Sequence, residues 1–144
     1  MSFDAREASR DDGRPFFLYT FTRGSNVVRL TSRARSIVFG GETYEPAAIS
    51  HGESVSGGSV TREGLEIELP RSHPLAQSLI GLGAPQPTGV TIWRAHETES
   101  ENRVIFKGRV TGARPERAIA TIRCSSVFSL LRTPGLGGKI TRLC

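Results

Sequence analysis

The sequence predicts a mainly β domain (α+β), in which antiparallel sheets form a barrel- or sandwich-like domain with two short helices. Short runs of apolar, aromatic and β-branched residues alternate with turn residues at hairpin spacing. Two segments have the apolar spacing of a helix, and both are short. The chain has 144 residues, of which 37% are hydrophobic, and this is enough for one compact core.

Composition divides the chain into three segments. Residues 1–14 are polar and charged and predict an N-terminal arm with little core of its own. A β-rich domain is expected over residues 15–134, and the glycine-rich residues 135–144 predict an extended tail. The first residues lack the apolar stretch of a secretory signal, and no apolar run is long enough to span a bilayer.

The first predicted hairpin follows the arm. Residues 16–22 are rich in aromatic and β-branched residues and predict a well-buried strand. Residues 23–26 contain Gly and Asn, which tolerate turn conformations, and residues 27–31 predict the partner strand.

A second hairpin is expected from residues 36–39 and 43–45, because Gly40 and Gly41 form a turn signal between them. The glycine- and serine-rich residues 51–58 predict a loop or an irregular edge strand.

Residues 65–69 predict a half-buried strand because apolar residues alternate with Glu66 and Glu68. The spacing places both carboxylates on one face, where paired acids could do acid–base chemistry. The simpler interpretation is that this is the solvent face of the strand.

Two short helices are expected. Ser72 is the predicted cap of the first, Pro74 lies in its first turn and Gly81 ends it. The second is predicted to begin near Ser125 and Ser126.

Three long strands are predicted between the helices, over residues 89–94, 104–110 and 118–124, with a turn at residues 112–115. The alternation places Trp93 on the face opposite Val90 and Ile92. Trp93 is then either an interface anchor on the outer face or part of a strand buried on both sides.

The formal charge is +5, from nineteen Lys and Arg against fourteen Asp and Glu. An anionic partner such as nucleic acid is one interpretation, and a solvated arginine-rich surface is the simpler one. Four arginines are grouped around the two predicted hairpins: Arg23, Arg29, Arg33 and Arg35. A nucleic-acid-binding β-barrel would also need accessible aromatic residues, whereas the aromatic run at 16–21 is typical of a core.

The residue types needed for catalysis are not arranged in any familiar pattern. The three histidines form no His-x-x-His pair, and His73 and His96 are expected at the surface. Cys124 is expected in the core, and the glycine-rich pieces lack the Lys-Ser/Thr of a phosphate loop. We therefore predict a non-enzyme with no catalytic and no cofactor-binding residues, which also disfavours a small cell-wall hydrolase.

Seven segments, in their order and spacing, resemble the N-terminal region of the tail-tip (baseplate) hub proteins of long-tailed phages and gene transfer agents. The resemblance covers essentially the whole chain, and the segments are residues 17–21, 28–32, 39–46, 67–70, 90–92, 106–110 and 125–132.

This resemblance implies a structural protein of the virion tail tip, assembled in the cytoplasm of a bacterial host. It implies a hub domain that joins the tail tube and its distal ring to the central tip structure. The implied partners are the distal tail or tube protein, the central tip or fibre protein and the tape measure. Further copies of the chain would form a ring, expected to be trimeric, around a channel through which DNA passes transiently. No membrane partner is implied.

The resemblance also gives Cys144 a meaning. The resembling proteins continue beyond this position with further cysteines that hold an iron–sulfur cluster, so we expect this chain to be truncated or the ordered part of a longer one. Cys144 would match one iron–sulfur ligand if the chain continues. No cofactor is expected within the 144 residues, because one thiolate cannot hold a cluster.

Overall fold

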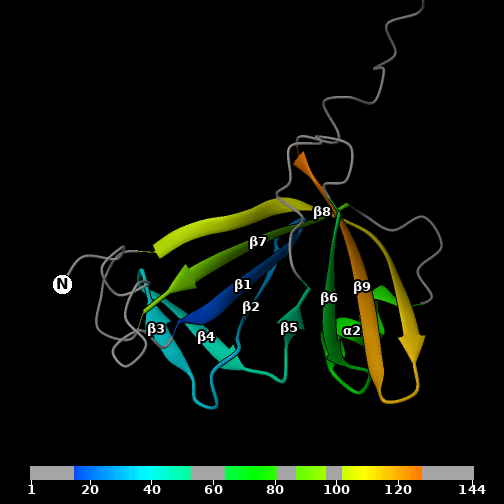
Figure 1. The fold of residues 1–144 in the computed structure, drawn as a ribbon, viewed down its shortest axis with the longest axis horizontal. Helices are drawn as coiled ribbons and strands as arrows, with labels where there is room; N and C mark the ends of the chain where they lie inside the picture. The colour runs from blue at the N-terminus through cyan, green and yellow to red at the C-terminus, as the bar shows by residue number, and fades with distance from the viewer. Residues whose placement is uncertain (1–14, 53–63, 81–86, 97–101, 128–144) are drawn as a thin grey trace, which may run out of the picture.

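A computed structural model describes residues 15–52, 64–80, 87–96 and 102–127, which form a single bent sheet with one helix (Figure 1). The order of the nine strands in the sheet is β3-β4-β2-β1-β7-β8-β9-β6-β5. The elements are β1 (Phe16–Arg23), β2 (Asn26–Thr31), β3 (Ile37–Phe39), β4 (Glu42–Pro46), β5 (Ser50–His51), β6 (Gly64–Pro70), α2 (Pro74–Leu79), β7 (Thr88–Ala95), β8 (Asn102–Glu116) and β9 (Ile119–Ser126). All pairings are antiparallel except the short parallel pairing of β2 with β4.

The long strand β8 joins the two halves of the sheet. Its residues 102–109 pair with β7, whereas its residues 108–116 pair with β9. Gly108 lies where the two pairings meet, opposite Val90 on one side and Ser126 on the other. A Cβ atom at this position would overlap the carbonyl oxygen of Ser125 and crowd the ring of Phe106. The close approach of three strands at the bend therefore requires glycine.

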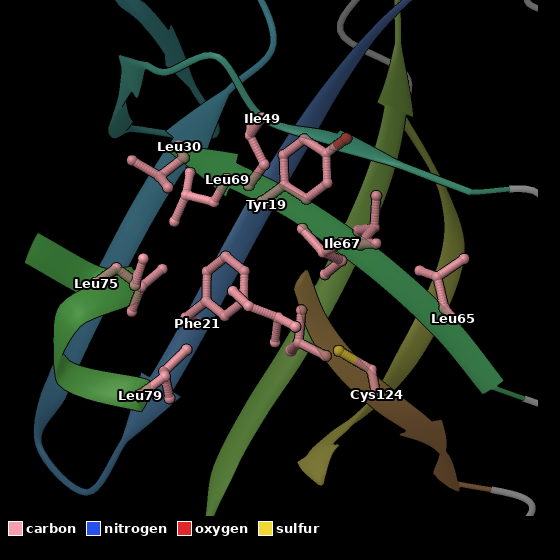
Figure 2. Close-up of a cluster of buried hydrophobic side chains, with 14 of the residues drawn as sticks. Tyr19, Phe21, Leu30, Ile49, Leu65, Ile67, Leu69, Leu75, Leu79 and Cys124 are labelled. Carbon is pink, nitrogen blue, oxygen red and sulfur yellow. The ribbon is translucent and has the colours of Figure 1, made fainter. Parts of the chain in front are cut away.

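The bend lets the two halves of the sheet face each other across one hydrophobic core, which we call the main core (Figure 2). Alternation along β1 buries Tyr19 and Phe21, and alternation along β6 buries Ile67 and Leu69. The helix α2 adds Leu75, Ala76 and Leu79 to the same core. The fold class predicted from the sequence, mainly β with antiparallel pairing, is confirmed.

A second, smaller cluster lies on the other face of β1 and β7, and we call it the outer cluster. It consists of Phe16, Leu18, Tyr44 and Ala95, with Ile37, Phe39 and Trp93 packed against them. The β3–β4 hairpin covers it, and Gly40 and Gly41 both take positive φ in the two-residue turn of that hairpin. Trp93 is therefore on the face opposite Ile92, as the alternation predicts, and this chain itself covers it in part.

Two local predictions are wrong. Residues 112–115 were expected to form a turn, but they belong to β8, and the turn follows at residues 117–118. A bulge between Val110 and Gly112 shifts the register and lets the strand continue. The cap of α2 is His73 and not Ser72, because the backbone N–H of Leu75 donates to Nδ1 of His73 over 3.2 Å.

Several predicted segments cannot be compared with the structure. The arm at residues 1–14 and the tail at residues 135–144 lie outside the described residues. The strand β9 continues through Ser126, and the rest of the predicted second helix lies beyond Val127, where the described residues end. Among the described residues, no helix is long and apolar enough to cross a membrane.

Candidate functional site

A pocket opens beside β1 and β5, and His51 is its central polar residue. The cavity has a volume of about 380 Å³, and its lining includes Phe17, Tyr19, Ile49, His51, Ser32 and Ser50. The imidazole of His51 lies edge-on to the ring of Phe17, with 4.6 Å between the ring centroids. The position of His51 follows from the pairing of β5 with β6, which places His51 opposite Ile67. We call this cavity the His51 pocket.

A hydrogen bond fixes the imidazole of His51. The hydroxyl of Tyr19 lies 2.7 Å from Nδ1 of His51. Burial raises the pKa of Tyr19 well above its usual value, so the phenol stays protonated, and its hydroxyl can pair with either tautomer of a neutral imidazole. Burial also lowers the pKa of His51, which favours the neutral imidazole.

This arrangement suits binding better than catalysis. The described lining of the pocket contains no carboxylate, amine or thiol. Of its two serines, Ser32 already accepts a hydrogen bond at Oγ from the backbone N–H of Phe17 over 3.0 Å. One of the two imidazole nitrogens of His51, Nδ1, is engaged by the Tyr19 hydroxyl. The pocket therefore offers apolar and aromatic walls and one orienting imidazole.

His73, His96 and Cys124 are not among the described lining residues of this pocket. His73 caps α2, and burial lowers the pKa of its imidazole while Glu45 opposes that shift. His96, expected at the surface, is only 2% exposed, because the end of β7 carries it into the packed interior. Burial raises the pKa of Cys124 to about 12, so its thiol is inert at neutral pH. Cys144, the possible iron–sulfur ligand, lies outside the described residues.

Metal binding finds no support in the part of the chain that the structure describes. No group of three or more His, Cys, Asp or Glu side chains comes together there. Glu66 and Glu68 are exposed on the outer face of β6, as expected for a solvent face, and Glu66 pairs with Arg123 at 3.5 Å. They do not form a pair of acids within a pocket.

Three of the four arginines around the first hairpins make separate contacts, and the fourth, Arg35, is exposed. Nε of Arg23 donates to the Thr88 hydroxyl over 3.1 Å. Arg29 forms an ion pair with Glu42 at 3.4 Å, and the guanidinium of Arg33 lies 4.9 Å from the centroid of the Phe16 ring. The aromatic residues that a nucleic-acid-binding barrel would use for stacking are mostly buried: Phe16, Tyr19 and Phe21 are at most 5% exposed.

A concentration of basic residues that the sequence did not single out lies on β7 and the first half of β8. The stretches at residues 87–96 and 102–109 contain Arg94, Arg103, Lys107 and Arg109 and no acidic residue. Lys107 and Arg109 point to the outer face, because their strand neighbours Phe106 and Gly108 face the main core. The sequence hides this concentration, since the acidic residues 97–101 separate the two stretches along the chain.

Comparisons with known proteins give a clear likeness among the solved structures. No protein-family model and no curated protein matches the chain. Among solved structures, a chain of the "Virion of native gene transfer agent (GTA) particle" superposes with a TM-score of 0.69 at 17% sequence identity. The match covers 99% of this chain and 48% of that one. The two chains share a fold, and the present chain spans about half the length of the virion chain.

Proposed function

We propose that this chain is a structural, non-enzymatic component of a phage-like particle, and more specifically a hub subunit of its tail tip. The observation that carries the proposal is the superposition of nearly the whole chain on a chain of a gene transfer agent virion. The resemblance of seven sequence segments to tail-tip hub proteins supports the finer assignment, since it rests on strand and turn residues and does not depend on the superposition.

The geometry is consistent with a protein that acts through its surfaces. The His51 pocket lacks an acid–base pair, and the described residues bring no metal ligands together. The outer face of the bent sheet instead carries an uneven charge distribution, with Lys107 and Arg109 on β8 and with Glu66 and Glu68 on β6. Surfaces of this kind give orientation and partner choice in protein assemblies.

In the proposed assembly, several copies, expected to be three, form a closed ring. Each copy would contact the next through two different surfaces, as a heterologous contact requires. The distal tail protein would bind on one side of the ring and the central tip protein on the other. A cluster held by Cys144 and further cysteines would belong to a C-terminal region and not to this domain.

The proposal is tested by native mass spectrometry of the purified chain, alone and with distal-ring and tail-tube proteins, at several ionic strengths. Closed oligomers or stoichiometric complexes with those proteins are expected. A chain that stays monomeric with both proteins would count against a hub. If that monomer also bound single-stranded DNA with strong salt dependence, a nucleic-acid-binding β-barrel would replace the proposal.

A further inference from the structure

Among the described residues, the first half of β8 has a strand partner on one side only. Residues 102–107 pair with β7 on one side, and β9 pairs with β8 only from Gly108 onward. No other described strand neighbours these residues, and in Figure 1 this part of β8 runs along the margin of the sheet. One row of backbone N–H and C=O groups therefore faces away from β7, in the geometry that pairs with an added strand.

The side chains along this edge are basic and apolar. Val104 is 51% exposed and pairs with Trp93 across the strands, at the margin of the outer cluster. Lys107 and Arg109 are exposed on the same outer face, and neither forms an ion pair with another described residue. No acidic residue lies within residues 87–96 or 102–109 to neutralise them.

These charges decide what kind of strand can add here. Two copies of this edge would bring like charges opposite each other, which disfavours self-pairing. The bulge of β8 opposite Ile92 and Trp93 interrupts the edge and limits a flat, indiscriminate pairing. A strand with acidic residues on its outer face would instead place carboxylates beside the ammonium of Lys107 and, diagonally, the guanidinium of Arg109.

We propose that residues 102–107 of β8 are a docking edge for an extended acidic segment of a neighbouring protein, which adds to the sheet as a strand. Backbone hydrogen bonds would supply the pairing, Lys107 and Arg109 would select carboxylates, and Val104 would contact a small apolar side chain of the partner. This inference rests on the proposed function, because it gives the chemistry of one of the partners of the subunit.

The first test uses a synthetic peptide of about eight residues that alternates Glu with Val and Thr. Its binding to the full chain is measured by fluorescence anisotropy. The double variant Lys107→Glu/Arg109→Glu is expected to weaken binding at least about tenfold, since two cross-strand charge pairs become repulsive. The control Arg114→Glu reverses one charge in the other half of β8, half the change of the double variant, and is expected to change affinity by less than about twofold.

The second test separates strand addition from attraction between charges. Two versions of the peptide carry N-methyl groups at alternate residues, one on the odd and one on the even positions. In a paired strand only alternate N–H groups point to the neighbour, so one version is expected to lose at least about tenfold in affinity and the other to keep it. Equal binding by both versions, or binding that Lys107→Glu/Arg109→Glu leaves unchanged, would overturn the inference.

The result is distinguishable from the test of the proposed function. A stoichiometric complex with the distal-ring protein, in which the amides of residues 102–107 exchange with solvent as fast as in the free chain, would leave the hub in place and remove the docking edge. If the chain bound the peptide with the expected variant effects but bound none of the tail proteins, the docking edge would stand and the hub assignment would fall. Preference of the edge for single-stranded DNA over the acidic peptide would also overturn the inference.

Discussion

The main core and the outer cluster are built from opposite faces of the same strands, and they differ in how they are closed. The main core lies between two halves of one sheet and is sealed by α2, so Ile67 and Leu69 are fully buried. The outer cluster is covered by one hairpin, and Trp93 stays half-buried. The bend of the sheet therefore holds the domain together, whereas the β3–β4 hairpin is an addition to its outer face.

The largest expected effect is on the main core. Ile67→Ala removes a fully buried side chain and is expected to lower the free energy of unfolding by about 3–4 kcal/mol, because the rigid surroundings leave a cavity. Urea denaturation followed by Trp93 fluorescence measures the change. Ile119→Ala, at a position 44% exposed, is the control and should cost less than about 1 kcal/mol. Equal losses would mean that the main core is not where the stability lies.

The bend itself is tested by Gly108→Ala. The added methyl group meets the backbone of Ser125, which cannot move without shifting β9, so a loss of about 2–3 kcal/mol is expected in thermal or urea denaturation. Gly112→Ala lies in the same strand with no atom near the new methyl group. This control should be neutral or stabilising by up to about 1 kcal/mol.

The outer cluster is expected to respond less. Trp93→Ala should cost about 2 kcal/mol, since the side chain is only half-buried and contacts Tyr44 edge-on at 6.5 Å between centroids. A double-mutant cycle with Tyr44→Leu is expected to give a coupling of about 0.5–1.5 kcal/mol. If Trp93→Ala removed the protection of main-core amides from hydrogen exchange, this would contradict the view that the outer cluster is an addition.

The smallest expected effect is the pH dependence from His51. Because burial lowers the pKa of His51 in the folded chain, the unfolded chain binds the proton first as the pH falls. The neutral imidazole's contribution to the free energy of unfolding is fully present at pH values above 6.5, the ordinary pKa of histidine. It is lost as the pH falls from 6.5 to the lowered pKa of His51 in the folded chain. His51→Gln should therefore flatten the decline of stability as the pH falls below about 6.5, measured as the free energy of unfolding at about pH 8 and about pH 5. His73 titrates in both proteins and cancels in the difference, and an unchanged decline would show that His51 is not desolvated.

The strands were predictable from the sequence because burial follows simple alternation. Residues 65–69 alternate in sequence and in exposure, and the turn at Gly40 and Gly41 has the conformation that its residues favour. The continuity of β8 was not predictable, because Gly112 and Pro115 are ordinary turn residues and the bulge that accommodates the strand depends on its pairing with β9. The true turn uses Arg117 at positive φ, a residue that carries no turn signal.

The candidate sites were less predictable than the fold. The contact of His51 with Tyr19 joins strands β5 and β1, which are not neighbours in the sheet, so no local pattern could reveal the pocket. The docking edge at residues 102–107 was likewise not predictable, because it exists only where β9 does not yet pair with β8, and this pairing begins at Gly108. Residue chemistry in the sequence correctly identified Glu66 and Glu68 as a solvent face, because that inference needs the alternation of one strand alone.

The order of the strands in the sheet has a consequence for how the chain acquires its structure. The central pairing joins Phe16 to Ala95 and Arg23 to Thr88, so β1 must wait for a partner that is made much later. Strands β7, β8 and β9 are consecutive in both sequence and sheet, and we expect them to form first, with the N-terminal hairpin docking last. During synthesis the aromatic side chains of β1 leave the ribosome uncovered, and dilute conditions or a chaperone should raise the yield of refolded protein.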